Sequence, residues 1–402
     1  MKCLIINATF GDGSTGTIVR DIQQNCLRSG IDCKVAYAHS SQPQNEIKGW
    51  KIGNLFSNKL HALLSRINGK HGYFSYLTTL RLTKIIDEYQ PDIINIHNLH
   101  SNFINLGILL NYVAQKDIPL LATLHDCWFF TGGCVHFTNA NCDKWLNDCK
   151  GCPKKKLDTP AYFKDCAAEI LADRHRLFGN IKNLTCVGVS EWITSQARQT
   201  VFKNASCLTI HNGIDTTIFQ PKTSTLKKDL GLEGKTIILG PASKWLDPIN
   251  SELLHCVSNA LSDNRVLLLF GYNGKNQLNL PNVITYPFTT SKQQLAELYS
   301  IADMFANCSR EDTLSSINIE AQACGTPLVT YDNTGSKETA HPELSDCVAT
   351  GDYQTMARII LNAPQKNAGT AAKLHSWVAE HFDKDKNYRQ YVQLFNHIAA
   401  RP

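Results

Sequence analysis

Acidic side chains with a spacing that suits the binding of sugar hydroxyls gather in the segment Ser309–Pro327. Glu311 and Asp312 come directly after a short apolar run, and Glu320 lies inside the helix predicted to end at Gly325. Carboxylates accept hydrogen bonds from vicinal hydroxyls, and the free N–H groups of a helix start suit phosphate oxygens. Ligands of open α/β sheets bind at this carboxyl edge. The segment predicts a ligand site; a capped surface helix with incidental acids is the alternative.

Histidines lie at the carboxyl ends of two predicted strands in the first half of the chain. His97, Asn98 and His100 end one strand, and His125 and Asp126 end the next. Imidazole and carboxylate groups serve both proton transfer and the orientation of hydroxyls. His97, Asn98 and His100 are therefore candidates for contact with a ligand, with simple loop packing as the alternative.

Four cysteines follow these histidines. Cys134, Cys142, Cys149 and Cys152 have the spacing C-x7-C-x6-C-x2-C, and four thiolates ending in C-x2-C suit a closed, structural zinc site. A catalytic zinc is not expected, because four cysteines leave no open position. The alternatives are reduced thiols that pack a loop, or a disulfide in an oxidised sample. Basic residues around the last pair suit a lipid diphosphate at a membrane surface: Lys150, Lys154, Lys155 and Lys156.

Apolar strands alternate with helical patterns along the whole chain, which is typical of parallel sheets covered on both faces. The pattern restarts after about residue 230, so we expect two doubly wound α/β domains. The predicted strands are Lys2–Asn7, Asp32–Ala38, Ile93–His97, Leu120–His125, Thr185–Val189, Cys207–Ile210, Lys235–Gly240, Arg265–Phe270, Val283–Tyr286, Met304–Ala306 and Leu328–Tyr331.

The chain has 402 residues, which favours two hydrophobic cores over one. We expect an N-terminal domain over residues 1–208, with a cysteine-rich loop at 127–156, and a C-terminal domain over 209–382. The boundary is marked by Asn212-Gly213, which favours a turn, and by Pro221, which interrupts a helix. The last segment, 383–402, is predicted to be a helix that packs back on the N-terminal domain.

The composition describes a globular protein without a membrane span: 43% of the residues are hydrophobic and 19% are charged. Fifteen scattered cysteines and the lack of an export signal favour a cytoplasmic protein. Residues 1–200 hold 22 Lys and Arg against 16 Asp and Glu, and residues 201–402 hold 18 against 19. The basic half suits an anionic surface or an acidic acceptor, with ordinary solvated charge as the alternative.

The run SREDTLSSINIEAQACGTPLV resembles the E-x7-E region of glycosyltransferase family 4, the retaining enzymes of the GT-B fold, and most of all its capsule, O-antigen and colanic-acid branch. HNGID at 211–215 is similar to the hinge of that family. The resemblance implies a GT-B fold, two Rossmann-like doubly wound domains facing a cleft. It also implies that Asp312 or Glu311 contacts the donor sugar, in a catalytic role, and that Glu320 holds the ribose hydroxyls.

Further roles follow from the same resemblance. Backbone groups of Thr313, Leu314 and Ser315 would face the sugar, and Gly13 and Gly16 would approach the donor diphosphate.

His125 and Asp126 belong to a His-Asp-x-Trp motif that resembles the one beside the reacting sugar in this family, which implies a catalytic role; a structural histidine at a strand end is the alternative. His97, Asn98 and His100, at the end of the preceding strand, would line the acceptor pocket.

One family feature is missing: Pro248 and Ile249 stand where a basic pair neutralises the diphosphate. We expect Ser243 and Lys244 to bind the donor, and the ammonium of Lys244 to take the place of the missing basic pair.

The resemblance therefore implies a retaining hexosyltransferase that uses a UDP- or GDP-linked sugar. The predicted acceptor is a saccharide or an undecaprenyl-diphosphate-linked oligosaccharide in surface polysaccharide assembly. We expect catalysis to need no cofactor and nucleic acid not to be a partner. The expected location is the cytoplasm, with a peripheral position at the inner face of the membrane as a further possibility. The alternatives are a GT-B nucleotide-sugar epimerase, a nucleotide-sugar-binding protein that has lost turnover, and a zinc-dependent nucleic-acid binder, which the acidic second half disfavours.

Overall fold

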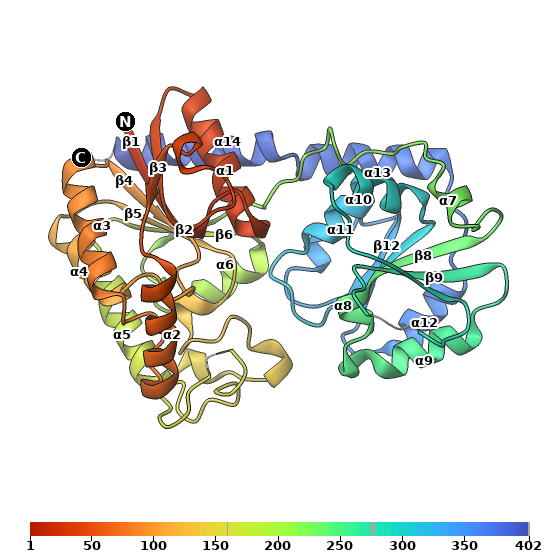
Figure 1. Ribbon diagram of the computed structural model, residues 1–402, viewed down its shortest axis with the longest axis horizontal. Coiled ribbons are helices and arrows are strands. Elements are labelled where there is room, and N and C mark those ends of the chain that lie inside the picture. Colours follow the sequence, from red (N-terminus) through yellow and green to blue (C-terminus); the bar gives the residue numbers. More distant parts are fainter. Residues whose placement is uncertain (159, 275–277, 401–402) are drawn as a thin grey trace. The chain divides into compact units, whose positions relative to one another are not determined.

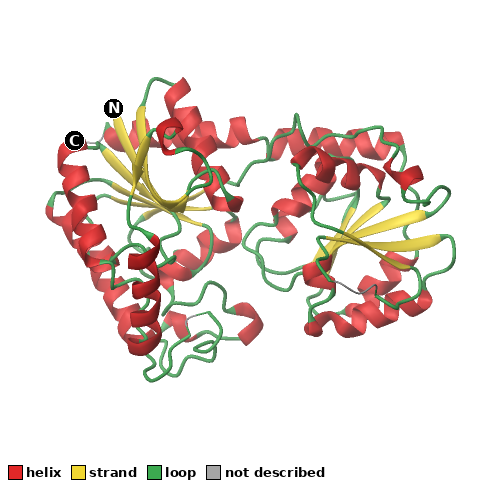
Figure 2. Ribbon diagram, viewed as in Figure 1, coloured by secondary structure: helices red, strands yellow, loops and turns green. Residues whose placement is uncertain are grey.

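The chain folds into two compact α/β units, seen in a computed structural model that describes residues 1–158, 160–274 and 278–400. The first unit comprises Met1–Asn212 together with Asp385–Pro402, and the second comprises Gly213–Lys384. The last two residues of the predicted helical segment 383–402 lie outside the described part of the chain. Each unit contains its own parallel sheet with helices on both faces (Figure 1, Figure 2).

The first unit is built on a seven-stranded sheet of order β3-β2-β1-β4-β5-β6-β7, in which every pairing is parallel. Its strands are β1 (Lys2–Thr9), β2 (Asp32–His39), β3 (Gly49–Lys51), β4 (Ile93–Ile96), β5 (Leu120–Leu124), β6 (Leu184–Gly188) and β7 (Ser206–Thr209). Its helices are α1 (Gly13–Arg28), α2 (Leu55–Asn68), α3 (Tyr76–Tyr89), α4 (Leu106–Gln115), α5 (Ala167–Gly179), α6 (Glu191–Ala197) and α14 (Lys384–Ala399).

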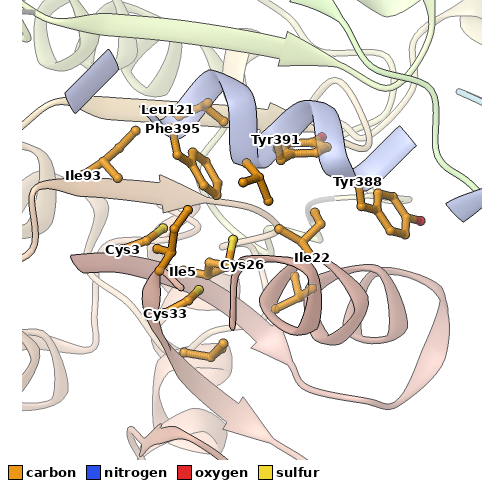
Figure 3. Close-up of a cluster of buried hydrophobic side chains, with 14 of the residues drawn as sticks. Cys3, Ile5, Ile22, Cys26, Cys33, Ile93, Leu121, Tyr388, Tyr391 and Phe395 are labelled. Atoms are coloured by element: carbon orange, nitrogen blue, oxygen red, sulfur yellow. The ribbon is translucent and has the colours of Figure 1, made fainter. Parts of the chain in front are cut away.

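One core of this unit lies between the sheet and two helices from opposite ends of the chain. Figure 3 shows Ile22 of α1 and Phe395 of α14 directed toward Ile5 of β1. Tyr388 and Tyr391 of α14 are almost completely buried in the same cluster. The C-terminal helix is therefore part of the hydrophobic core of the first unit, and burial of this aromatic face is its main source of stability.

The second unit is built on a six-stranded parallel sheet of order β10-β9-β8-β11-β12-β13. Its strands are β8 (Thr236–Pro241), β9 (Arg265–Phe270), β10 (Val283–Tyr286), β11 (Met304–Asn307), β12 (Leu328–Tyr331) and β13 (Asp346–Val348). Its helices are α7 (Leu226–Asp229), α8 (Ala242–Trp245), α9 (Ser251–Ala260), α10 (Lys292–Ile301), α11 (Ser316–Ala323), α12 (Tyr353–Leu361) and α13 (Ala368–His381).

Each sheet contains one point at which the strand order reverses. It lies between β1 and β4 in the first unit and between β8 and β11 in the second. Helices leave these neighbouring strands toward opposite faces of the sheet, which opens a crevice at their carboxyl ends where ligands bind in doubly wound folds. The two reversal points are therefore the positions to search for a site.

The predicted strands are confirmed to within one or two residues at each end. Two strands were missed, β3 and β13, and both are three-residue strands at sheet edges. Edge strands are short and half-solvated, so they lack the continuous apolar run that marks a central parallel strand.

Candidate active site

The loops that follow β8 and β11 are joined at the reversal point of the second sheet. The buried amide of Asn250 donates to the carbonyl oxygens of Lys244 and Cys308, each at 3.0 Å. The indole N–H of Trp245 donates to the carbonyl oxygen of Ala306 at 2.9 Å. These bonds bring α8, which carries the predicted donor residues Ser243 and Lys244, against the start of the acidic segment.

A basic side chain reaches the stretch in which the expected basic pair is missing. The guanidinium of Arg310 donates to the carbonyl oxygen of Ile249 at 2.9 Å and to Oδ1 of Asn250 at 3.3 Å. Pro248 and Ile249 belong to a short 3₁₀ helix, Pro248–Asn250. Arg310 therefore places positive charge beside the positions that carry none of their own. Sequence reasoning passed over it because the contact joins two loops that are far apart in the chain.

The start of α11 is left without a side-chain cap. Ser315, at the capping position, makes no hydrogen bond to the first-turn N–H groups. Its hydroxyl accepts instead from the buried amide of Asn307 at 3.2 Å, and that amide also donates to Asn318 at 2.8 Å. First-turn N–H groups have no partner within a helix, so those of α11 remain available for ligand oxygens.

The loop before α11 is rigidly attached to the loop after β12. The backbone N–H of Asp312 donates to the hydroxyl of Thr334 at 3.1 Å, and its carbonyl accepts from the N–H of Gly335 at 3.1 Å. Glu311 and Asp312 are half-buried. Thr313 and Leu314 are buried, and the hydroxyl of Thr313 has no hydrogen-bond partner among the described residues. This orphaned polar group marks the loop as a place where a ligand would complete the hydrogen bonding.

Glu320, in the middle of α11, is a half-buried carboxylate with few neighbouring groups that stabilise its negative charge. Its Oε2 accepts from the hydroxyl of Tyr299 on α10 at 3.2 Å. Burial raises the pKa of Glu320 to about 7, although Lys292 and the Tyr299 hydrogen bond act in the opposite direction. A carboxylate kept in a poorly solvated place without a close cation is unfavourable for folding and is typical of binding sites.

In the first unit, three side chains at the ends of β4 and β5 form a hydrogen-bonded chain. The amide of Asn95 donates to the carbonyl of Leu121 at 3.1 Å and to Thr123 at 3.0 Å, so its Oδ1 is directed toward His97. Nε2 of His97 lies 2.8 Å from that oxygen, and Nδ1 of His97 lies 2.8 Å from Nε2 of His125.

This chain determines where the protons of both imidazoles reside. Burial lowers the pKa of His97 well below its ordinary value, and burial lowers the pKa of His125 to about 4. Both rings are therefore neutral near pH 7. Since Oδ1 of Asn95 only accepts, Nε2 of His97 carries its proton, and His125 must donate through Nε2. Nδ1 of His125 is then an unprotonated nitrogen that can accept a hydrogen bond or a proton.

His100 and Asp126 form a neighbouring hydrogen-bonded pair. Nε2 of His100 lies 3.0 Å from Oδ2 of Asp126, and Oδ1 of Asp126 accepts from the N–H of Trp128 at 2.8 Å. Burial alone would lower the pKa of His100, but the charge and hydrogen bond of Asp126 raise it. The pKa of Asp126 is lowered: burial opposes ionisation, but His100 and the Trp128 N–H outweigh it. Asp126 thus serves as the partner of His100, and Nδ1 of His125 remains available as a hydrogen-bond acceptor.

A buried arginine that sequence reasoning missed supports this loop. Arg174 of α5 is fully buried, donates to the carbonyl oxygens of Trp128 and Thr131, and lies 4.1 Å from the centroid of the Trp128 ring. A fixed guanidinium with stacking and hydrogen-bonding partners holds the turn after Asp126 in one conformation.

The glycine-rich loop after β1 lies at the same edge as the histidines. The N–H of Ala8 donates to the carbonyl of Asn98 at 3.1 Å, which joins the ends of β1 and β4. Gly13 begins α1 and is exposed. At Gly16 a Cβ would lie 2.7 Å from the hydroxyl of Thr9, so only glycine allows this close approach of helix to strand. The residues predicted for the first unit are therefore brought to one sheet edge.

The four predicted zinc ligands surround one small cavity. Cys134, Cys142, Cys149 and Cys152 line it together with Trp145, and all four are free thiols. Burial raises the pKa of Cys134 to about 12 and that of Cys149 to about 11. Across the described part of the chain, no group of three or more His, Cys, Asp or Glu side chains is arranged to hold a metal ion. Zinc binding by this cluster stays a prediction.

Comparison with known families gives matches over both units. The model of the family described as "Glycosyltransferase Family 4" matches residues 15–218, just over half of the chain. The model of the family described as "Glycosyl transferases group 1" matches residues 259–372. The second match includes the whole acidic segment.

Individual relatives agree with these matches. WcaC of Escherichia coli, described as a colanic acid biosynthesis glycosyl transferase, is 25% identical over 370 residues, which cover 84% of this chain and 85% of WcaC. Sucrose-phosphate synthase from Thermosynechococcus elongatus has a TM-score of 0.66 at 15% identity, and covers 99% of both chains. HepE from Anabaena, solved with UDP-glucose, has a TM-score of 0.64 at 16% identity with the same coverage. The predicted GT-B fold is confirmed.

Proposed function

The chain belongs to glycosyltransferase family 4, and we propose that it transfers a hexose-type sugar from a UDP- or GDP-linked donor to a saccharide acceptor. The observation that carries the proposal is the environment of Glu320. This carboxylate has a raised pKa, and among the described residues its close partner is a tyrosine hydroxyl alone. A ribose offers two adjacent hydroxyls that would satisfy it, and their binding would offset its desolvation.

The donor diphosphate would be held by groups at the reversal point of the second sheet. Arg310 supplies a planar guanidinium beside Ile249, Lys244 supplies an ammonium from the adjacent helix, and the uncapped start of α11 supplies N–H groups. Charge develops on the diphosphate as the sugar departs, so preorganised donors at this place would stabilise the transition state. HepE, which shares this fold, binds UDP-glucose, and this supports a nucleotide-sugar donor.

The sugar would be contacted by the loop that precedes α11. Glu311 or Asp312 would accept hydrogen bonds from its hydroxyls, and the unpartnered hydroxyl of Thr313 would donate or accept there. We expect the reaction to retain the anomeric configuration. In that reaction the acceptor attacks from the face that the diphosphate leaves, and a phosphate oxygen of the leaving group takes the proton of the acceptor hydroxyl.

In the first unit, His125 would orient a reacting hydroxyl. Nε2 of His125 donates to His97 within the hydrogen-bonded chain, so Nδ1 of His125 is available to accept a hydrogen bond from that hydroxyl. His97 and Asn95 act through His125 and are positioning residues in this proposal. Gly13 and Gly16 open the start of α1 for an anionic group of the substrate.

The proposed acceptor class is supported by a relative that matches most of this chain. WcaC is described as a colanic acid biosynthesis enzyme, which supports an acceptor that belongs to a surface polysaccharide, such as capsule or O-antigen. Such an acceptor is a saccharide, free or linked to undecaprenyl diphosphate. The protein would then work in the cytoplasm, at or near the inner face of the membrane.

A thermal-shift screen with UDP-, GDP-, ADP- and dTDP-sugars tests the donor site, followed by measurement of nucleoside diphosphate release with and without saccharide acceptors. We expect one nucleotide class to raise the Tm in wild type but not in Glu320→Ala, since a ligand at 100 times its Kd stabilises by about 2.7 kcal/mol. A flat response of the folded protein to every donor would contradict the proposal. Release of a free epimer without a disaccharide would favour the epimerase, and donor binding without turnover would favour a binding protein.

A further inference from the structure

Helix α2 has its polar and apolar faces inverted relative to a helix that packs on a core. The residues it buries are polar: Asn58, His61 and Ser65. Leu64 is half-buried, and the other five large apolar side chains of the helix are exposed to solvent. They are Leu55 (68% exposed), Phe56 (79%), Leu60 (45%), Leu63 (51%) and Ile67 (39%). A surface helix normally shows the opposite arrangement, so this apolar face has no packing partner among the described residues.

The start of α3 has the same inversion. Thr78 and Thr79 are buried, whereas Tyr76 is 55% exposed, Leu77 83% and Leu80 48%. Polar contacts hold the two helices together on their inner side. Nδ1 of His61 lies 2.6 Å from the hydroxyl of Ser75, and the hydroxyls of Ser57 and Thr78 lie 3.4 Å apart.

A third segment adds two exposed aromatic rings at the other end of α2. The N–H of Tyr162 donates to the carbonyl of Arg66 at 2.7 Å, and the thiol of Cys166 donates to the carbonyl of Asn68. Tyr162 is 64% exposed and Phe163 is 79% exposed. Figure 1 shows α2 at the surface of its unit, beside the loops that precede α5. We call α2, residues 76–80 and residues 162–163 together the apolar surface.

The segment that carries α2 and the start of α3 contains charged residues of one sign only. Residues 47–86 contain seven Lys and Arg and not a single Asp or Glu. Lys70 and Lys164 share Glu169, from α5, in ion pairs of 3.1 Å and 2.6 Å. Lys59, Arg66, Arg81 and Lys84 are exposed and form no ion pair within the described residues. The exposed apolar side chains therefore stand among cations that lack counter-charges.

We propose that the apolar surface docks on an anionic lipid bilayer, with its apolar side chains inserted at the level of the headgroups and its basic residues against lipid phosphates. Exposed Leu, Phe and Tyr side chains interspersed with Lys and Arg are the combination that holds interfacial helices on anionic membranes. Among the described residues, no helix is long and apolar enough to cross a bilayer, so the contact is peripheral.

A neighbouring pocket places this surface beside the substrate edge of the sheet. The pocket has a volume of about 430 Å³ and is lined by Ala38, His39, Lys51, Asn54, Leu55 and Phe56. Its walls thus come from the carboxyl ends of β2 and β3 and from the start of α2. Docking would hold this edge close to the lipid headgroups.

A second copy of the chain is the alternative partner for the apolar surface, but the positive charge of the surface disfavours self-association. A two-fold interface would bring the unpaired cations of one surface against the same cations of its copy, whereas interface cores are depleted of lysine. Anionic lipid provides the complementary charge.

Vesicle sedimentation of the full chain tests the proposal, with vesicles of phosphatidylcholine alone or mixed equally with phosphatidylglycerol. The double variant Phe56→Ser/Leu77→Ser removes two of the three most exposed apolar side chains of this surface, and Lys59→Ala/Arg66→Ala removes two unpaired cations. Phe288→Ser and Lys228→Ala/Lys373→Ala, in the second unit, are the matched controls. The unfolding temperature of each variant is compared with that of wild type.

We expect wild type to bind the anionic vesicles and not the neutral ones, each surface variant to bind at least about tenfold more weakly, and the controls to bind as wild type. Equal binding by the surface variants, or no wild-type binding to anionic vesicles, would overturn the proposal. So would a lipid-free dimer that Phe56→Ser/Leu77→Ser converts to a monomer. The assay contains neither donor nor acceptor, so its result is separate from that of the transfer reaction.

Discussion

The guanidinium of Arg310 donates a hydrogen bond to the carbonyl oxygen of Ile249, 2.9 Å away. The two residues lie in different loops, one after β11 and the other after β8, and these loops meet because β8 and β11 are neighbours in the sheet. The contact puts a cation at the place where the sequence of this chain has Pro248 and Ile249 and where related sequences are expected to carry a basic pair.

Arg310→Ala should impair use of the donor. Loss of a preorganised cation at the departing diphosphate is expected to lower kcat/KM by about 10²-fold. Arg310→Lys keeps the charge but loses the planar fork, so its kcat/KM should fall between the two. Steady-state kinetics with varied donor measure this, with Lys228→Ala as the control. A kcat/KM of Arg310→Ala within twofold of wild type would show that other groups neutralise the diphosphate.

Glu320→Gln should stabilise the free protein and abolish its response to the donor. The folded-state pKa is about 7 against an ordinary value of 4.5. The folded protein therefore prefers the protonated form. Ionisation of Glu320 lowers the free energy of unfolding as the pH rises above about 4.5, and this destabilisation reaches its full size above pH 7. Glutamine removes this penalty, so the variant should gain about 1–3 kcal/mol at pH 8 and progressively less toward pH 5.

Thermal unfolding across this pH range, with and without donor, measures both effects of Glu320→Gln. Glu252→Gln, an exposed acid of the same unit, serves as the control. A Tm difference that does not change with pH would show that Glu320 is not desolvated.

The tautomer of His125 can be read directly by nitrogen-15 NMR. At pH 7 we expect a neutral ring with the proton on Nε2 and none on Nδ1, because Asn95 and His97 form the hydrogen-bonded chain that requires it. The ring should stay neutral down to about pH 5, since burial lowers its pKa to about 4. A proton on Nδ1 would contradict the proposed acceptor role.

His125→Ala should lower kcat more than it weakens donor binding. A positioned imidazole contributes about 10²–10⁴-fold to proton transfer or hydroxyl orientation. The donor-induced rise in Tm should persist, because the residues proposed for donor binding in the second unit are untouched. A variant with unchanged kcat would place His125 outside the reaction.

The zinc prediction is tested by metal analysis of protein purified without chelator. A structural site should retain about one zinc per chain and lose it in Cys152→Ser with a fall in Tm, whereas the exposed Cys256 of the second unit provides a control in Cys256→Ser. Metal-free protein with four titratable thiols in the cluster would show that Cys134, Cys142, Cys149 and Cys152 stabilise their loop by packing alone.

Much of the fold was predictable because its signals are local. Central parallel strands are buried on both faces, so Lys2–Thr9 or Arg265–Phe270 appears as a continuous apolar run in the sequence. The end of α11 was predictable for the same kind of reason, since Gly325 adopts a φ of 80° just after the helix. The acidic segment and the histidine motifs were recognisable because each is a short run of consecutive residues.

The sequence by itself determined the two α/β units, the strand ends that carry the chemistry and the family to which the chain belongs. The tertiary structure alone decided which of those ends meet. The order of strands in a sheet is set by packing between distant segments. The contacts between His97 and His125 and between Arg310 and Ile249 therefore could not be predicted from the spacing of these residues along the sequence. The inverted faces of α2 were likewise visible only in the fold, because a helical pattern shows an apolar stripe but not whether it faces the core or the solvent.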